Sequence, residues 1–327
     1  MFEIENPNTL DINILVIGVG GGGCNAVRAM AKDAHPSVRF LLLDSNILSR
    51  REDPLTAIQI GAHLTKGLGT GGNVAQGKEI AGTSLDLIAP HLENVSMVFV
   101  ATTLGGGFGT GAAPSIAKLS REKGILTVGL AALPFPREGR KRMKTALEGL
   151  NQFSQNVDSM IVISNEKMLQ TAKGKVGILE GFRPGNEMLA QAVCGIVDVI
   201  FTEGLINLDF ADIRTVMGHQ GAVIMGKGRA HSEKQHTERV INAIKSATES
   251  PLLYQRDISE GKRVLVNIVG PPDMTMEEFH GAMDYLGSKV GEEAEIIAGL
   301  GIDESAQGTV LVTVLVSGLP LKIDEMK

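Results

Sequence analysis

The stretch Val98-Phe99-Val100-Ala101, followed closely by Gly105-Gly106-Gly107-Phe108-Gly109-Thr110-Gly111, decides the fold class of this chain. The first segment is typical of a buried strand, and residues 112–123 have the pattern of a helix. A loop this rich in glycine allows backbone N–H groups to approach an anion closely, because no side chains intervene. The N-terminus of the following helix adds partial positive charge. The strand, loop and helix together predict a phosphate-binding segment.

Two more glycine-rich segments precede this loop. Gly18-Val19-Gly20-Gly21-Gly22-Gly23-Cys24-Asn25 follows an apolar strand, and Lys66-Gly67-Leu68-Gly69-Thr70-Gly71-Gly72-Asn73 is the other. The first has the spacing of a dinucleotide-binding fingerprint, whereas none of the three ends in the Gly-Lys-Ser/Thr of a Walker A loop. Three such segments predict one nucleotide held from several sides by backbone amides. The alternative is that the glycines, 40 in the whole chain, only form tight turns.

Composition limits the classes of function that are open to the chain. Its 327 residues allow one large or two medium domains, and 43% hydrophobic and 21% charged residues are typical of a soluble globular protein. The formal net charge of -6 argues against non-specific nucleic-acid binding. No apolar stretch approaches the roughly 18 residues that span a membrane, so no direct membrane insertion is expected. Cys24 and Cys194 form no zinc pattern, and the N-terminus is no signal peptide, so a cytoplasmic location is expected.

Apolar runs alternate with helical patterns in the first half of the chain. Strands are expected over residues 12–17, 38–43, 97–101, 126–131 and 158–163, and helices over residues 24–33, 112–123 and 139–154. This alternation predicts an α/β fold with a parallel sheet covered by helices on both faces. Right-handed crossovers bring the loops that follow the strands to one edge of such a sheet. The three glycine-rich segments are therefore expected at the same edge.

The second half of the chain begins with a long helical pattern. Apolar residues at three-and-four spacing predict one helix over residues 186–203, buried between two layers. Beyond it, strands are expected over residues 223–225, 264–269 and 310–316, and helices over residues 232–248 and 275–289. These elements predict a smaller domain with a mixed sheet.

The chain resembles the FtsZ family, the bacterial and archaeal homologues of tubulin. The matching segments are ILVIGVGGGGCNAV (14–27), LTKGLGTGGN (64–73), GGGFGTGAAP (105–114), EGRKR (138–142) and GLINLDFADIRTVM (204–217). The resemblance extends from about Asp11 to Ser317. It implies a tubulin/FtsZ-like α/β fold with a parallel-sheet GTP-binding domain (11–175), a central helix region (176–203), a smaller α+β activation domain (204–318) and a short tail (319–327).

The resemblance also assigns residues to a bound GTP or GDP. Those that it implies along the phosphates are Gly20, Gly21, Gly22, Gly71, Gly72, Gly106, Gly107, Gly109, Thr110 and Gly111. It implies that Asn25 reaches the nucleotide, that Asn165 contacts the guanine and that Phe182 stacks on the base. Glu138 and Arg142 are assigned to ribose and nucleotide contacts, although two opposite charges four residues apart on one helix face are also typical of a surface salt bridge.

Asn207, Asp209 and Asp212 form the candidate catalytic loop. Two carboxylates and an amide at this spacing can orient or activate a magnesium-bound water for attack on a γ-phosphate. The alternative is a structural one, because Asn and Asp are common in turns and helix caps. The resemblance implies that this loop lies on the face opposite the nucleotide and completes the site of the next subunit. It therefore implies a head-to-tail homopolymer whose interface propagates rather than closes.

Several positions depart from the family pattern. Phe108 replaces a threonine, which is expected to add bulk beside the phosphates. Asp44 stands near the γ-phosphate, where a carboxylate is expected to repel the nucleotide unless it holds a cation. Asn186 replaces an aspartate that accepts two guanine hydrogen bonds, and an amide presents only one acceptor edge. Pro184-Gly185 opposes an early helix start, so Phe182 is expected on a loop.

Three hypotheses follow from these residues. The leading one is a cytoplasmic, filament-forming GTPase of cell division that uses Mg²⁺, with itself and other division proteins as partners and with no metal ligand assigned. The second is a structural paralogue with an altered pocket and weak or absent turnover, which Phe108 and Asp44 favour. The third, a Rossmann-type oxidoreductase, depends on the first glycine segment alone. The family usually continues past the position of Lys327 into a linker and a membrane-tethering peptide, and whether such a tail has been removed stays open.

Overall fold

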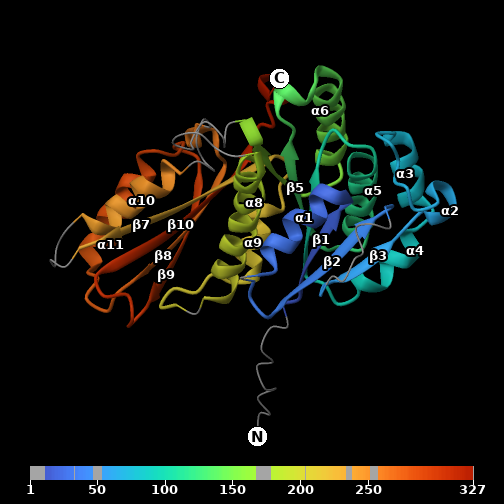
Figure 1. Ribbon diagram of the computed structural model, residues 1–327. Helices are drawn as coiled ribbons and strands as arrows, with labels where there is room; N and C mark the ends of the chain where they lie inside the picture. The colour runs from blue at the N-terminus through green and yellow to red at the C-terminus, as the bar shows by residue number, and fades with distance from the viewer. Residues whose placement is uncertain are drawn as a thin grey trace, which may run out of the picture.

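The computed structural model describes residues 12–32, 34–46, 54–166, 178–202, 204–232, 238–250 and 257–326. In these residues the strands form one ten-stranded sheet. Figure 1 shows the helix α8 (Ile178–Phe201) crossing in front of the middle of the molecule, with the N-terminal half to its right and the C-terminal half to its left.

The N-terminal half contains a parallel sheet. Its strands are β1 (Ile14–Val19), β2 (Val38–Asp44), β3 (Thr56–Gln59), β4 (Met97–Thr103), β5 (Leu126–Leu133) and β6 (Ser159–Ser164). They lie in the order β3-β2-β1-β4-β5-β6, and each neighbouring pair is parallel, which confirms the predicted sheet. The central strands are nearly continuous apolar runs because helices cover both faces. The short, partly exposed β3 was not predicted.

Helices cover both faces of this parallel sheet. They are α1 (Gly20–Met30), α2 (Ala62–Thr65), α3 (Val74–Gly82), α4 (Leu85–Ile88), α5 (Phe108–Glu122) and α6 (Arg140–Ser154), with 3-10 turns η2 (Ala89–Leu92) and η3 (Pro136–Glu138). One hydrophobic cluster packs α1 and α8 on one face, and a second packs α5 and α6 on the other. The helix starts expected at residues 24 and 112 are wrong, because the glycines before them form the first helical turns.

The start of α8 also differs from the prediction. The helix begins at Ile178 rather than at residue 186 and continues through Pro184-Gly185, so the backbone of Phe182 is helical and does not lie on a loop. Gly185 lies so close to the side chain of Asn165 that a Cβ would overlap Oδ1. Glycine at residue 185 therefore allows α8 to pass close to Asn165, although the segment has a weak helix propensity. The burial expected for this helix is confirmed, because its apolar residues belong to the hydrophobic cluster that also contains those of α1. In the described residues, no helix is long and apolar enough to cross a membrane.

Beyond β6 the sheet becomes mixed. Its strands, in the order β7-β10-β8-β9, are β7 (Ala222–His231), β10 (Thr309–Leu319), β8 (Arg263–Gly270) and β9 (Glu295–Ile302). β10 is antiparallel to both of its neighbours, whereas β9 is parallel to β8. β9 was not predicted from the sequence, because it contains two glycines and its apolar and polar residues do not alternate clearly. One parallel residue pair, Met160 with Ala222, joins this half of the sheet to β6.

The helices of the C-terminal half follow from this sheet. They are α9 (Phe210–Met217), α10 (Arg239–Thr248) and α11 (Met276–Gly287), with 3-10 turns η4 (Ile258–Glu260) and η5 (Ile323–Met326). The helix expected from residue 232 begins only at Arg239 in the described residues, because β7 continues to His231, which pairs with Thr309 of β10. α10 and α11 pack on the sheet through a third hydrophobic cluster. The proposed domain boundaries stay predictions.

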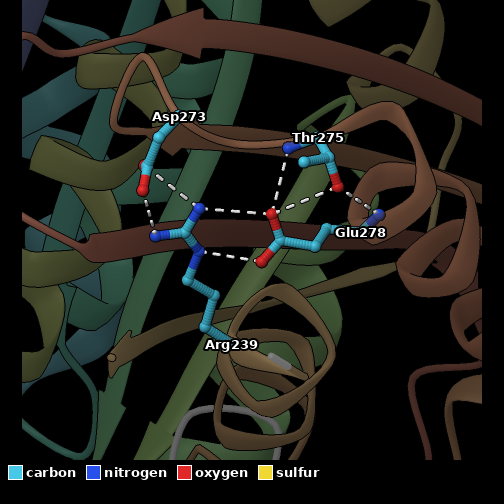
Figure 2. Close-up of polar contacts among 4 residues, drawn as sticks. All are labelled: Arg239, Asp273, Thr275 and Glu278. Atoms are coloured by element: carbon cyan, nitrogen blue, oxygen red, sulfur yellow. Dashed lines mark hydrogen bonds and ion pairs between the residues drawn. The ribbon is translucent and has the colours of Figure 1, made fainter. Parts of the chain in front are cut away.

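A buried ion pair joins α10 to α11. Arg239 is 1% exposed, and its guanidinium donates to both carboxylate oxygens of Glu278, at 2.8 and 3.2 Å, and to Asp273 (Figure 2). Glu278 also accepts the N–H of Thr275 in the capping box that begins α11. Burial lowers the pKa of Arg239, but the hydrogen bonds and charges of the two carboxylates outweigh this effect and raise the pKa. The charged network therefore fixes the two helices together, since loss of one partner would leave a buried charge.

Candidate nucleotide-binding and catalytic site

The three glycine-rich segments lie against one another at the carboxyl ends of β1 and β4. A Cβ on Gly20 would lie 3.1 Å from both the N and the Cα of Gly109, so the first segment packs on the third. A Cβ on Gly107 would lie 2.6 Å from the backbone N of Asn73 and would overlap Oγ1 of Thr70, so the second segment also packs on the third. These contacts place the segments at one edge of the sheet, as predicted.

The glycines of these segments fall into two groups. A Cβ on Gly71, Gly72 or Gly106 would have no neighbouring atom within 4 Å, and one on Gly21 would meet only Oδ2 of Asp44, at 3.8 Å. We call Gly21, Gly71, Gly72 and Gly106 the open glycines. Those at which a Cβ would lie under 3.0 Å from another atom are Gly18, Gly22, Gly23, Gly105, Gly107, Gly109 and Gly111. The open glycines border a space that a ligand can enter, whereas the others allow the loops to pack.

The two residues of the third segment with larger side chains point into the protein. Thr110 is fully buried, and its Oγ1 accepts the N–H of Gly105 at 3.0 Å. Phe108 is also buried and belongs to the hydrophobic cluster that includes α5 and α6. The ring is thus part of the core, although its Cδ1 would lie 3.7 Å from a Cβ on Gly20, so the bulk expected beside the phosphates stays a prediction. Direct contact of Thr110 with a phosphate stays a prediction.

Glu138 and Arg142 form an ion pair beside the third segment. Nη1 of Arg142 lies 3.0 Å from Oε2 of Glu138, while Oε1 of Glu138 accepts the N–H of Phe135 at 2.8 Å. The two residues were expected on one helix face. Instead, Glu138 lies in η3 and Arg142 lies in α6, so they do not share one helix. A Cβ on Gly105 would lie 2.8 Å from Cγ of Arg142, which shows how closely this side chain approaches the glycine loop.

Asp44 and Asn25 border the open space near Gly21. Asp44 ends β2 and is buried, and its Oδ1 accepts the N–H of Asn46 at 3.1 Å. Asn25 is exposed about one turn after Gly21 in α1, and its side-chain oxygen accepts a hydrogen bond from Arg28 at 2.9 Å. The structure therefore places both side chains beside the first glycine segment.

The candidate base-contacting residues gather where β6 ends and α8 passes. Asn165 follows β6 directly and lies against Gly185. Asn186 is the next residue of α8 and is half-buried. The structure therefore brings Asn165 and Asn186 to the same place, while the side chain of Phe182 lies outside the described residues.

Asp209 and Asp212 form the capping box of α9. Oδ1 of Asp209 accepts the N–H of Asp212 at 2.9 Å, and Oδ2 of Asp212 accepts the N–H of Asp209 at 3.0 Å. Oδ1 of Asn207 accepts the N–H of Gly204 at 2.7 Å. Asp212 therefore belongs to the first turn of a helix that was not predicted. Asp209 and Asp212 thus have the helix-capping role that was the structural alternative for them. Asp209 is nevertheless exposed and Asp212 half-exposed, so both carboxylates can still reach another molecule.

Thr102 and Thr103, at the end of β4, also belong to the site but were not identified from the sequence. Oγ1 of Thr102 donates to the carbonyl of Val19 at 3.1 Å, and the side chain of Thr103 fills the place where Gly22 lacks one. They join the first glycine segment to the strand that precedes the third. The available signal was the change from apolar to polar residues at the end of this strand.

The glycine segments and the Asp209–Asp212 pair lie near opposite ends of α8. The helix has 24 residues, so it is about 36 Å long at 1.5 Å per residue. Asn186 is the ninth of these residues and lies about 22 Å from the last one at the same rise, and the segment that carries Asn207 and Asp209 follows that end. In Figure 1, α8 runs downward through the middle of the molecule, and this segment leaves its lower end. One subunit therefore does not bring its own carboxylates to its own glycine loops.

Comparisons with known proteins show the family to which the chain belongs. Residues 13–173 match the GTPase domain of the Tubulin/FtsZ family, and residues 221–320 match the C-terminal domain of the FtsZ family. A cell division protein FtsZ of Pseudomonas putida is 39% identical over 326 residues, which cover 99% of this chain and 81% of that protein. The chain belongs to the FtsZ family. A second cell division protein FtsZ, from Pseudomonas aeruginosa, is also 39% identical over 331 residues and covers 99% of this chain and 82% of its own length.

Solved structures show the same fold as this FtsZ-family chain. The empty FtsZ dimer of M. jannaschii superposes with a TM-score of 0.81 at 35% identity, over 94% of this chain and 88% of that one. The GTPγS-bound protofilament of CetZ2 from Haloferax volcanii has a TM-score of 0.80 at 21% identity, over 96% of each chain, and supports the fold alone. With its matched GTPase domain, this chain is a GTP-binding GTPase of the FtsZ family.

Proposed function

We propose that this FtsZ-family GTPase hydrolyses GTP at sites that two subunits share within head-to-tail filaments of the cell-division machinery. The observation that carries the proposal is the separation of the open glycines from Asp209 and Asp212 by the part of α8 that follows Asn186, which is about 22 Å long. A carboxylate that assists water attack must lie within hydrogen-bond reach of that water. The carboxylates of one subunit therefore act on the nucleotide of the next, and a filament repeats this contact along its length.

The nucleotide end of each subunit holds and orients GTP. Backbone N–H groups around Gly21, Gly71, Gly72 and Gly106 bind the phosphates, with the help of the N-terminal turns of α1 and α5. Asn25, Glu138 and Arg142 contact the nucleotide from the sides of this space. Asn165 and Asn186 contact the guanine, and Phe182 stacks on it. Asp209 and Asp212 of the neighbour position the attacking water, and Asn207 supports the segment that carries them.

Mg²⁺ fits this site as an ion held mainly by the nucleotide. The described residues contain no group of three or more His, Cys, Asp or Glu side chains that could hold a metal by themselves. Mg²⁺ commonly binds through one or two carboxylates together with substrate phosphates and water. The buried carboxylate of Asp44, beside Gly21, suits that role. When bound, the ion would neutralise phosphate charge, and the repulsion expected between Asp44 and the nucleotide would be offset.

The structural-paralogue hypothesis has less support. One of its two observations, Phe108, is weakened because that ring is buried in the core rather than exposed to the open space. The relatives that match over nearly the whole chain are named cell division protein FtsZ. Partners other than the chain itself, and a cytoplasmic location, remain predictions of this proposal.

A mixing experiment tests the shared site. Asp212→Ala removes the carboxylate but leaves the nucleotide end intact, whereas Gly106→Ala fills open space at the nucleotide end and leaves the carboxylates intact. Each variant alone is expected to release little phosphate at a GTP concentration that saturates the wild-type protein. In the mixture, the carboxylates of Gly106→Ala subunits can act on GTP held by Asp212→Ala subunits, so phosphate release returns. Absence of recovery in mixed filaments that sediment normally would contradict the proposal.

A further inference from the structure

The strand β9 holds the segment that leads from α8 to the catalytic carboxylates. The N–H of Ile206 donates to the carbonyl of Leu300 at 3.1 Å, and the N–H of Leu300 donates to the carbonyl of Ile206 at 3.0 Å. β9 is the last strand of the sheet, so this bridge uses an edge that no other strand pairs with in the part of the chain that the structure describes. In Figure 1 the yellow segment between α8 and α9 extends toward β9. Two reciprocal hydrogen bonds thus fasten an otherwise exposed segment.

Leu208 adds a side-chain anchor to this backbone bridge. Its exposed fraction is 8%, whereas that of Leu205, in the same segment, is 72%. Leu208 packs directly over Gly299 of β9. A Cβ on Gly299 would lie 2.6 Å from Cδ1 of Leu208 and 2.8 Å from Oδ1 of Asn267. A side chain at residue 299 therefore cannot coexist with Leu208 in its present place.

Gly204 interlocks with β9 at the other end of the segment. A Cβ on Gly204 would overlap the carbonyl oxygen of Leu300, so the two backbones approach as closely as glycine allows. The N–H of Gly204 donates to Oδ1 of Asn207, which closes the turn between them. The segment is thus fixed before and after Ile206, and its last anchor, Leu208, directly precedes Asp209.

We propose that Gly299 and Leu208 are positioning residues that set where Asp209 and Asp212 project from the subunit. This inference rests on the proposed function, because it concerns the reach of these carboxylates toward the next subunit. The capping box joins the two carboxylates, so a shift of Leu208 displaces them as one unit. A misplacement of about 1 Å can lower a rate on the order of 100-fold. β9 therefore contributes to catalysis by positioning the two carboxylates, without contacting the nucleotide itself.

Two substitutions test this role from opposite sides. Gly299→Ala forces Leu208 out of its place, and Leu208→Ala removes the anchor without any steric collision. Both are expected to lower phosphate release per subunit by about 10- to 100-fold at saturating GTP. Affinity for a fluorescent GTP analogue is expected to stay within about twofold of wild type, because the binding residues lie at the other end of α8. Gly270→Ala in β8 is the matched control, since its Cβ would meet chiefly the flexible end of Met274, and turnover should be kept.

Mixing separates a positioning defect from a folding defect. Gly299→Ala mixed with Gly106→Ala is expected to recover turnover, as Asp212→Ala does, whereas Gly299→Ala mixed with Asp212→Ala is not. Wild-type turnover by both Gly299→Ala and Leu208→Ala would overturn the positioning role, as would a parallel loss of GTP affinity. If Asp212→Ala and Gly106→Ala fail to complement each other, the shared site itself is wrong, and the positioning role falls with it.

Discussion

Individual glycines at the nucleotide end do two different jobs. At Gly107, Gly109 and Gly111 the missing side chain lets one loop pack against the backbone of another. At Gly71, Gly72 and Gly106 it leaves open space at the loop surface. The sequence shows only that all are glycines, because the distinction depends on contacts between segments that are far apart in the chain. The same limit explains Phe108, whose burial follows from the position of α3 and α5 rather than from its neighbours in sequence.

Gly106 and Gly107 offer a matched pair of substitutions. Gly107→Ala is expected to lower the free energy of unfolding by about 1–3 kcal/mol, because its Cβ would overlap Thr70 and the backbone of Asn73. Gly106→Ala is expected to change that energy by less than about 1 kcal/mol, since the Cβ enters open space. It should nevertheless weaken GTP binding. Denaturant unfolding without nucleotide and titration with a fluorescent GTP analogue measure the two effects, and the reverse ranking in stability would refute this division of roles.

At the scale of elements, the first turn of α9 combines helix capping with the proposed catalytic role of its carboxylates. Its capping box uses the same two carboxylates that are proposed to act on the neighbouring nucleotide. The free energy of such a cap is about 0.5–2 kcal/mol. A simple deletion of either carboxylate therefore disturbs both roles, and its effect on turnover cannot be assigned to one of them.

Two conservative substitutions separate the roles. Serine is a good N-cap residue and glutamate is the usual third-position partner of a capping box. Asp209→Ser and Asp212→Glu are thus expected to keep α9 and the stability of the protein within about 1 kcal/mol. Turnover should still fall at least about tenfold, because the first removes a carboxylate and the second moves one. Wild-type phosphate release by both variants would mean that these residues only cap the helix.

The elements differed in how far the sequence could predict them. The central parallel strands and the helices α1, α5 and α6 were predicted from apolar runs, because both faces of that sheet are buried, whereas β3, α2, α3 and α4 were not predicted. Helix starts were less predictable, since Gly20 and Phe108 begin helices only through packing of their glycine-rich first turns. α8 begins at Ile178 and continues through Pro184-Gly185, although both residue types disfavour a helix interior. β9 was not predicted, because Gly299, which allows the close contact with Leu208, interrupts the usual residue pattern of a strand.

At the scale of the whole molecule, one continuous sheet and one long helix determine where the chemistry can occur. The parallel half gathers three glycine segments at its edge, and α8 carries the chain from Asn186 about 22 Å to its end, where the segment with the carboxylates begins. β9 then fixes these carboxylates at the far end. The residue types at both ends were identified from the sequence. Their mutual distance, which makes the site a shared one, required the structure.

Phosphate release measured against protein concentration, with GTP and ATP in parallel in magnesium buffer, tests the shared site most directly. Because each site needs two subunits, turnover per subunit is expected to be near zero at low concentration and to rise cooperatively above a threshold. The rise should occur with GTP only and should coincide with sedimentable filaments. Turnover per subunit that is independent of concentration, with no filaments present, would show that one subunit hydrolyses GTP alone and would contradict this account.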